Sequence, residues 1–154
     1  MNNIETISRA LIMKDGKLLL CKSVPHGNYY LPGGHVEFGE SAEQALKREM
    51  IEECGSEISN LHFVGCFENK WGEPVHHEYN LIYTVDISDA NVVSKEDHIV
   101  FEWVETSKLK GLLFYPPEFI NAIAEWCEDK KDIYLSTRSE EHTSELQSRL
   151  QISY

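Results

Sequence analysis

Short runs of apolar residues alternate with polar segments along most of the chain and predict a series of β-strands. Asp15 and Gly16 separate the runs at 7–13 and 18–22. An Asp-Gly pair between two apolar runs is a strong signal for a β-hairpin. Further runs predict strands at 61–68, 78–87 and 99–104, with Trp103 facing the core. We expect loops or short connections at 23–28, 69–77 and 106–113.

Two segments show helical spacing instead. The first covers residues 42–53: Ser41-x-x-Gln44 has the form of a capping box, and Gly55 stands where a helix-ending glycine belongs. The second begins at Pro116-Pro117, because proline suits the first helical turn, and runs to about Asp129. Its apolar face consists of Phe119, Ile120, Ile123, Ala124 and Cys127. Strands mixed with helices predict an α/β fold.

The first predicted helix carries three carboxylates within about one turn. Glu49, Glu52 and Glu53 lie at i, i+3 and i+4 and therefore share one face. They border the apolar stripe of Leu46, Met50 and Cys54, which should pack on the core. Like charges so close together repel one another, and partial burial disfavours ionisation further. A hard divalent cation such as Mg²⁺ relieves both effects, whereas an acidic helix end in solvent is the alternative interpretation.

The chain has 154 residues, which suits one domain with a sizeable core, and a formal net charge of −12. A charge of this sign argues against nucleic-acid backbones and anionic membranes as partners. A phosphate-containing substrate would be neutralised by divalent metal instead of a basic surface.

The cysteine pattern and the N-terminus predict a cytoplasmic protein. The four cysteines form no C-x-x-C pair and no zinc-like Cys/His spacing, which indicates small thiols in a reducing compartment. Residues 1–10 lack the features of a signal peptide, and no stretch of about 18 apolar residues could span a membrane.

The spacing around the acidic helix resembles the Nudix box, G-x5-E-x7-R-E-U-x-E-E-x-G-U, where U is a bulky apolar residue. Gly34, Glu40, Arg48, Glu49, Met50, Glu52, Glu53 and Gly55 occupy its positions. Only the last position departs from the box, because Ser56 replaces an apolar residue there. That difference concerns packing after the helix and leaves the chemistry intact.

The resemblance implies a Nudix-type α/β/α sandwich, with a mixed β-sheet between helices, over residues 1–137. It implies hydrolysis of a diphosphate linkage with Mg²⁺, or with Mn²⁺. The expected metal ligands are Glu49, Glu53, Glu52 and the carbonyl of Gly33, which belongs to the Pro-Gly-Gly turn that commonly precedes the box. Glu40 and Gly34 would support them and Arg48 would orient them. The general base stays open between Glu52 and Glu96, with Asp97 next to Glu96 as a further acid.

Substrate identity is weakly marked. Aromatic residues near the expected cleft could stack on a base, namely Tyr29, Tyr30, Phe67, Trp71 and Tyr79. We take Tyr30, Trp71 and His77 as candidate substrate contacts. We do not expect His76 and His77 to chelate one metal together, because neighbours on a strand point to opposite faces. The motifs that mark subgroups of the Nudix family do not identify the substrate. We expect a small nucleotide such as ADP-ribose or a (deoxy)nucleoside triphosphate, not capped RNA.

Two other functions are consistent with the same fold. A Nudix-like domain can bind nucleotides without hydrolysing them, but such sensors usually lose acids of the box, and this chain keeps all of them. A Nudix-fold isomerase of prenyl diphosphates would use a cysteine in the cleft, for which Cys66 is the candidate. The sequence is compatible with a monomer or a homodimer.

The last 17 residues require separate treatment. Residues 138–148 read RSEEHTSELQS, which is what a widely used sequencing adapter spells when it is translated in one frame. We therefore expect residues 138–154 to be an artefact outside the domain, and exclude them from the fold prediction.

Overall fold

The computed structural model describes residues 2–137 and contains two β-sheets. The first sheet has the strand order β5-β1-β7-β6-β9. These strands are β1 (Ile4–Leu11), β5 (Gly33–His35), β6 (Ile58–Trp71), β7 (His76–Ile87) and β9 (Ile133–Ser136). The β1–β7 and β6–β9 pairs are parallel, and the β1–β5 and β6–β7 pairs are antiparallel. The sheet is therefore mixed.

The second sheet is built around β3 (Lys17–Ser23). This strand pairs antiparallel with β2 (Met13–Lys14), β4 (Tyr29–Tyr30) and β8 (Ile99–Glu105). Leu18, Leu19, Leu20 and Cys21 of β3 are fully buried. Both faces of this strand are therefore covered.

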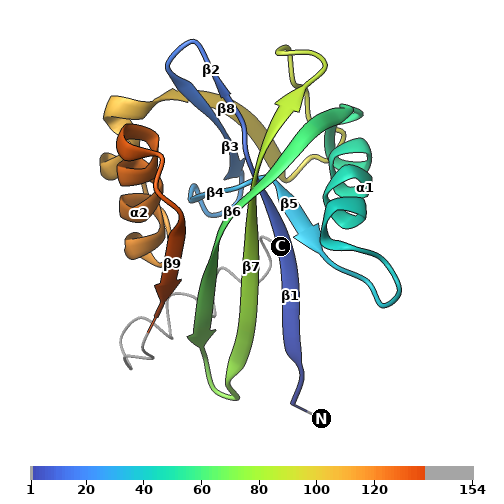
Figure 1. Cartoon of the computed structure of the whole chain (residues 1–154), viewed down its shortest axis with the longest axis vertical. Coiled ribbons are helices and arrows are strands. Elements are labelled where there is room, and N and C mark those ends of the chain that lie inside the picture. The colour runs from blue at the N-terminus through green and yellow to red at the C-terminus, as the bar shows by residue number, and fades with distance from the viewer. Residues whose placement is uncertain (1, 138–154) are drawn as a thin grey trace.

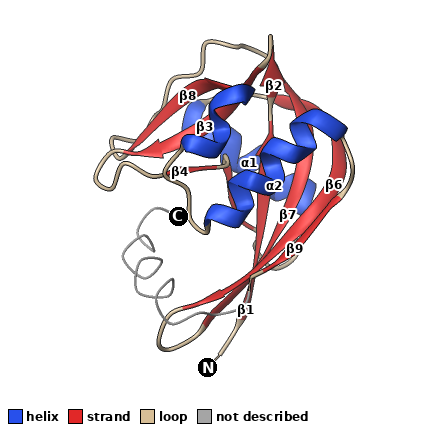
Figure 2. Cartoon of the chain, turned by 90° about the vertical axis from the view of Figure 1, so that its left-hand side faces the viewer, coloured by secondary structure: helices blue, strands red, loops and turns tan. Residues whose placement is uncertain are grey.

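The two α-helices lie on opposite sides of the sheets (Figure 1). Ala45, Leu46 and Met50 of α1 (Ala42–Cys54) are buried, and Leu46 and Met50 pack with Ala10, Leu19 and Tyr83. On the other side, α2 (Pro117–Asp129) packs Phe119, Ile120 and Ile123 on a cluster that contains Leu11, Phe67 and Ile82. Figure 2 shows α2 in front of the strands. This arrangement confirms the predicted α/β fold with a mixed sheet between helices.

Both predicted helices form, and α1 has the expected caps. The Ser41 hydroxyl accepts a hydrogen bond from the Gln44 N–H, and the Gln44 side chain accepts one from the Ser41 N–H. Gly55 adopts φ +67 at the C-terminal end, and its N–H donates to the Ile51 carbonyl. These caps fix where the acidic helix begins and ends. The connection predicted at 106–113 contains a short 3₁₀-helix, Thr106–Gly111.

The hairpin prediction is confirmed at its turn but wrong about its first strand. Asp15 and Gly16 adopt φ +50 and φ +74, and Met13 pairs with Leu18 across the turn. The first arm is only β2, however. The run predicted at 7–13 divides after Leu11, and β1 joins the other sheet beside β7. This long-range parallel pairing has no local sequence signal.

The loop predicted at 69–77 is shorter than expected. The antiparallel ladder between β6 and β7 continues to the pair Trp71 and His76, so that the turn comprises only residues 72–75. The rings of Trp71 and His76 stack with their centroids 4.5 Å apart, and this contact closes the ladder. The first of the two strands also begins earlier than predicted, at Ile58. Trp103 is partly buried and packs on the cluster that contains Leu46 and Met50 of α1, and its indole N–H donates to the Ala90 carbonyl.

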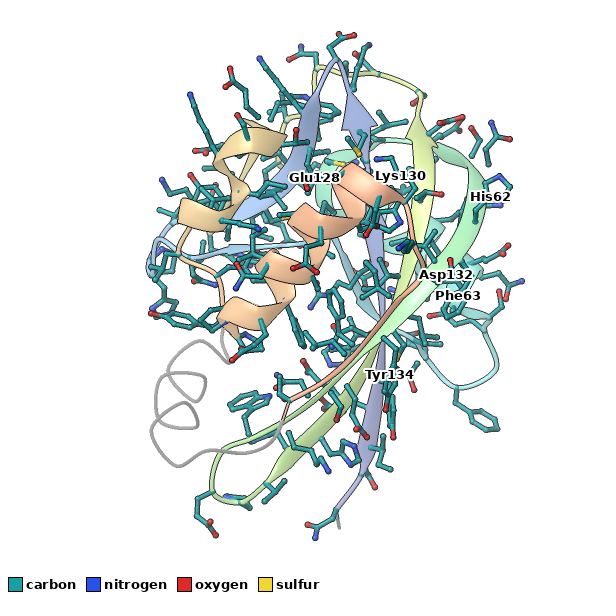
Figure 3. All side chains as sticks on the ribbon, turned by 60° about the vertical axis from the view of Figure 1, so that its left-hand side comes forward. His62, Phe63, Glu128, Lys130, Asp132 and Tyr134 are labelled. Carbon is teal, nitrogen blue, oxygen red and sulfur yellow. The ribbon has the colours of Figure 1, made fainter. Side chains whose placement is uncertain are left out.

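Strand β9 was not predicted from the sequence. Figure 3 shows Asp132 and Tyr134 on the segment that descends from α2 along β6. The Ser136 hydroxyl donates to the Glu68 carboxylate at 2.6 Å. The tail at 138–154, which we interpreted as an artefact, lies outside the described residues. Within residues 2–137, no helix is both long enough and apolar enough to cross a membrane.

We expect Gly65→Ala to destabilise the fold, because β9 approaches β6 closely at this glycine. A Cβ at residue 65 would lie 2.1 Å from the carbonyl oxygen of Ile133. The free energy of unfolding, measured by urea denaturation, should fall by about 2 kcal/mol. Gly111→Ala is the matched control, since a Cβ there meets nothing within 4 Å. Equal stability of the two variants would contradict the close packing of β9.

Candidate active site

A cavity of about 290 Å³ lies where α1, the first sheet and the segment before β8 come together. We call it the acidic cavity, and it is lined by Arg9, Tyr30, Gly33, Gly34, His35, Glu49, Glu53, Glu96, His98 and Ile99. Three of these residues carry carboxylates and one carries a guanidinium. Residues far apart in the sequence therefore meet here.

The α1 helix contributes two of the three predicted acids to the cavity. Glu49 and Glu53 are one turn apart and share a face. The Glu49 side chain is 17% exposed, and residue Glu53 is 9% exposed. The Glu52 side chain is 55% exposed and does not line the cavity. The three carboxylates thus divide into a pair inside the cavity and one at its outside.

Burial changes the proton affinity of both inner carboxylates. It raises the pKa of Glu53 to about 8, against the opposing effect of the Arg9 charge and with a smaller contribution from Glu49. It also raises the pKa of Glu49, where hydrogen bonding from Arg48 opposes the change. Glu53 Oε2 is buried and has no hydrogen-bond partner among the described residues. A cation bound at this oxygen would supply the missing electrostatic partner.

Arg48 holds the surrounding acids in place. Its guanidinium donates to both carboxylate oxygens of Glu40, at 2.7 and 3.2 Å. It also donates to Glu49 Oε1 at 2.9 Å, to Glu52 Oε2 at 3.3 Å and to the His35 carbonyl at 2.9 Å. These bonds lower the pKa of Glu40 and raise that of Arg48. Glu40 is the main partner of Arg48, and the orienting role of Arg48 stays a prediction that these bonds favour.

The glycines before α1 allow the backbone to approach its neighbours closely. A Cβ on Gly34 would lie 2.3 Å from the carboxyl carbon of Glu49, inside the space that this carboxylate occupies. A Cβ on Gly33 would lie 1.9 Å from the Ser8 carbonyl oxygen, because β5 pairs with β1 here. Larger residues at either position would displace the site.

The segment before β8 brings Glu96, one of the two candidates for the general base, to the cavity. Its carboxylate pairs with His98 Nε2 at 3.2 Å, and its backbone N–H donates to the Ser94 hydroxyl. Asp97, the neighbouring acid, does not line the cavity. His35 also lines it, and its Nε2 lies 3.4 Å from a carboxylate oxygen of Glu5.

Of the predicted substrate contacts, the cavity includes Tyr30 but not Trp71 or His77. Trp71 is buried against His76, and His77 Nε2 lies 3.0 Å from a Glu68 carboxylate oxygen. Cys66, the candidate for an isomerase, lies on β6 and does not line the cavity either. Arg9 does line it, although no sequence feature gave this residue a role. A single arginine in a predicted strand carries no motif that could have identified it.

The donor set suits a hard divalent cation. Carboxylate and carbonyl oxygens are the preferred ligands of Mg²⁺, and Glu49, Glu53 and the Gly33 backbone line the same cavity. Among residues 2–137, no three His, Cys, Asp or Glu side chains converge closely enough to form a metal site by themselves. A bound cation would therefore need backbone, water or substrate oxygens in addition to the glutamate pair.

Comparison with known proteins identifies the family. The family model of the NUDIX domain matches residues 5–127. An ADP-ribose pyrophosphatase from Methanocaldococcus jannaschii is 29% identical over 119 residues, which cover 75% of this chain and 70% of that protein. Nucleoside triphosphatase NudI from Escherichia coli is 36% identical, with 70% of this chain and 97% of NudI covered. NAD-capped RNA hydrolase NudC from Pseudomonas aeruginosa is 33% identical over 84% of this chain, which spans only 43% of NudC.

Solved structures show the same fold. A MutT NUDIX hydrolase from Burkholderia pseudomallei superimposes with a TM-score of 0.68 at 22% identity, covering 77% of this chain and 96% of that one. An ADP-ribose pyrophosphatase from Streptococcus suis superimposes with a TM-score of 0.65 at 18% identity, covering 88% and 98%. Since the family model covers most of the sequence, and Gly34, Glu49 and Glu53 of the box line the acidic cavity, this chain belongs to the Nudix hydrolase family.

Proposed function

We propose that this protein hydrolyses the diphosphate linkage of a small nucleotide with the help of Mg²⁺, or of Mn²⁺. The observation that carries the proposal is the glutamate pair in the acidic cavity. Glu49 and Glu53 are both withdrawn from solvent, and one oxygen of Glu53 has no protein partner among the described residues. An arrangement of this kind is unfavourable for an empty site and favourable for one that holds cations.

Glu49, Glu53 and the Gly33 carbonyl would hold the metal, whereas Glu52, the third acid expected as a ligand, does not line the cavity. When bound, Mg²⁺ supplies positive charge that neutralises phosphate oxygens and makes a water molecule more acidic. Arg48 fixes one oxygen of Glu49 and leaves the other available. Both oxygens of Glu40 bond to Arg48, which makes Glu40 a support for the ligands.

We assign the general base to Glu96 in preference to Glu52. Glu96 lines the cavity and its carboxylate is held by His98, whereas the Glu52 side chain is more than half exposed outside the cavity. A base must reach the proton that it removes. The protein's own contribution to the reaction would thus be a carboxylate that lines the same cavity as the α1 pair.

The substrate class follows from charge and from the relatives. ADP-ribose pyrophosphatase and NudI carry the names of enzymes for small nucleotides, and we place ADP-ribose and (deoxy)nucleoside triphosphates first. NudC is named for NAD-capped RNA, but a net charge of −12 disfavours an RNA chain as ligand. The proposal therefore excludes nucleic acid and membranes as partners, and it leaves the protein a monomer or homodimer in the cytoplasm.

A sensor that binds nucleotides without hydrolysing them is the second candidate. The intact acid set argues against it, because Glu40, Glu49, Glu52 and Glu53 are all present and Arg48 bonds the first three. A sensor would have no need for a buried, unpartnered carboxylate oxygen.

A hydrolysis screen with the full chain tests the function. We expect Mg²⁺-dependent release of a mononucleotide from ADP-ribose or from at least one nucleoside triphosphate, and no hydrolysis of NAD-capped RNA. Glu53→Gln and Glu96→Gln should each lower kcat at least about a hundredfold, the scale of a lost ligand or base. Binding without turnover would favour the sensor. Wild-type rates in both variants at matched Mg²⁺ would remove the assignment of the site.

The buried Glu53 carboxyl should make stability depend on pH in a specific direction. Its folded pKa of about 8 exceeds its unfolded value of 4.5. Between these values the unfolded chain has lost the proton and the folded protein retains it, so the stability of the wild type falls as pH rises.

Glu53→Gln removes this dependence. In EDTA, the variant should therefore become more stable than the wild type as pH rises from about 5 to 8, on the order of 1.4 kcal/mol per unit of pKa difference. Urea denaturation at several pH values measures the change, and added Mg²⁺ should reduce it. Glu52→Gln, which alters an exposed carboxylate on the same helix, is the control and should show no such trend.

Gly34→Ala should affect turnover more than stability. The new methyl group would meet the Glu49 carboxylate, which is the end of a flexible side chain and can move aside. A displaced carboxylate should lower kcat/KM about tenfold or more, since small misplacements slow catalysis strongly. The melting temperature should stay close to that of the Gly111→Ala control. Full activity in Gly34→Ala would show that the position of Glu49 is not critical.

A further inference from the structure

A further cavity of about 480 Å³ lies beside the turn of the β2–β3 hairpin. We call it the hairpin cavity, and it is lined by Lys14, Asp15, Lys17, Ala90, Asn91 and Trp103. None of these residues lines the acidic cavity. Figure 1 shows the hairpin at the end of the fold opposite to the turn between β6 and β7. Small-molecule sites usually have volumes of about 300–1,000 Å³, and the hairpin cavity lies within that range.

Two lysines give one edge of the hairpin cavity a positive charge. Lys14 and Lys17 are direct partners in the β2–β3 ladder, so their exposed side chains leave the same face of the sheet. Within residues 2–137, neither of them forms an ion pair with a carboxylate. Asp15 is the one acid in the lining and does not balance both charges. Like charges directly opposite each other are unfavourable, and an anion bound between them would relieve the repulsion.

Trp103 gives the same cavity an aromatic wall. On β8 it is the partner of Leu19, which lies two residues after Lys17, so the tryptophan and the two lysines share one face of the sheet. The indole N–H donates to the Ala90 carbonyl at 2.8 Å, which holds the partly buried ring against the segment that forms the other wall. Because this N–H is already engaged, Trp103 can offer only its ring to a ligand.

An aromatic ring that carries an anionic group matches both parts of the lining. Aromatic rings stack on tryptophan, and a lysine ammonium binds phosphate as a point charge. An inorganic anion alone would leave the tryptophan wall unoccupied, and an uncharged ring would leave the two lysines without a partner.

We propose that the hairpin cavity binds a small aromatic anion of the nucleoside monophosphate type, with its base on Trp103 and its phosphate on Lys14 and Lys17. This site is separate from the acidic cavity, because the two have no lining residue in common. Its charge also differs from that of the whole chain, which carries a net charge of −12. The lysine pair therefore gives an anion a local place to bind on an acidic protein.

Adenosine 5′-monophosphate (AMP) is the probe, and EDTA keeps divalent metal out of the acidic cavity during the measurement. Isothermal titration of the full chain should show binding by the wild type. The double variant Lys14→Gln/Lys17→Gln should bind at least about tenfold more weakly, since it loses both charged contacts. The control Lys110→Gln/Lys131→Gln also removes two exposed lysines, but neither of them lines the cavity, and it should bind like the wild type.

Fragments of the probe test whether both halves are recognised. Ribose 5-phosphate lacks the base and should bind about tenfold more weakly than AMP, on the scale of one lost stacking contact. A wild type that does not bind AMP would overturn the inference. So would wild-type affinity in the Lys14→Gln/Lys17→Gln protein, or equal affinity for AMP and ribose 5-phosphate.

NMR on the wild type gives an independent test of the tryptophan contact. The chain has three tryptophans, so each indole N–H signal can be resolved, and Trp103→Phe identifies the signal of Trp103. AMP should shift this signal and leave those of Trp71 and Trp126 in place, because neither of these lines the cavity. An unchanged Trp103 signal at saturating AMP would contradict the proposal.

Glu53→Gln separates this site from the acidic cavity. Glu53 does not line the hairpin cavity, so the variant should bind AMP in EDTA like the wild type. Weaker binding by Glu53→Gln, together with unchanged binding by the lysine variant, would place AMP in the acidic cavity and refute the inference. The test measures binding without metal or turnover, so its result does not depend on whether the protein hydrolyses nucleotides.

Discussion

The site depends on one guanidinium, that of Arg48. It joins the segment before α1 to the helix itself, because it bonds Glu40 and the His35 carbonyl on one side and Glu49 and Glu52 on the other. Without such a cation, these acids would repel one another and the loop would have no fixed distance from the helix. The hydrogen bonds of Arg48 also leave the acids with different numbers of oxygens for the cavity. Glu40 is fully engaged, Glu49 retains one oxygen for the cavity, and Glu53 is left to the cavity entirely.

The position of Glu53 follows from the same helix. Leu46 and Met50 are fully buried, and Glu53 lies seven and three residues after them, which places it on the same side. The stripe that anchors α1 on the sheet therefore also forces a carboxylate into the interior. Gly34 completes the arrangement from the opposite strand, since the space that a Cβ would fill is taken by the Glu49 carboxylate. Packing, and not exposure to water, determines where both acids point.

The sequence predicted most features that depend on local signals. The caps of α1, the turn at Asp15-Gly16 and the helix after Pro116 each have a short signature. The β1–β7 pairing could not be predicted, because it joins residues about 70 positions apart through backbone hydrogen bonds. β9 has only four residues, too few to show a period. Helical spacing placed Glu52 beside Glu49 and Glu53, but spacing alone does not show where the packed face ends. Arg9 was missed because its place in the lining arises only when distant segments come together to form the cavity.

Charged side chains of both signs line the acidic cavity, and they come from different elements. Glu49 and Glu53 line it from α1 and Arg9 lines it from the first sheet, so the Mg²⁺–nucleotide complex that we propose as ligand would meet charges of both signs. A free phosphate chain would meet Glu49, Glu53 and Glu96 in a protein of net charge −12, and a free cation would meet Arg9. A nucleotide diphosphate complexed with Mg²⁺ presents both charges at once. The same argument disfavours long polyanions, because acidic residues outnumber basic ones in a chain of net charge −12.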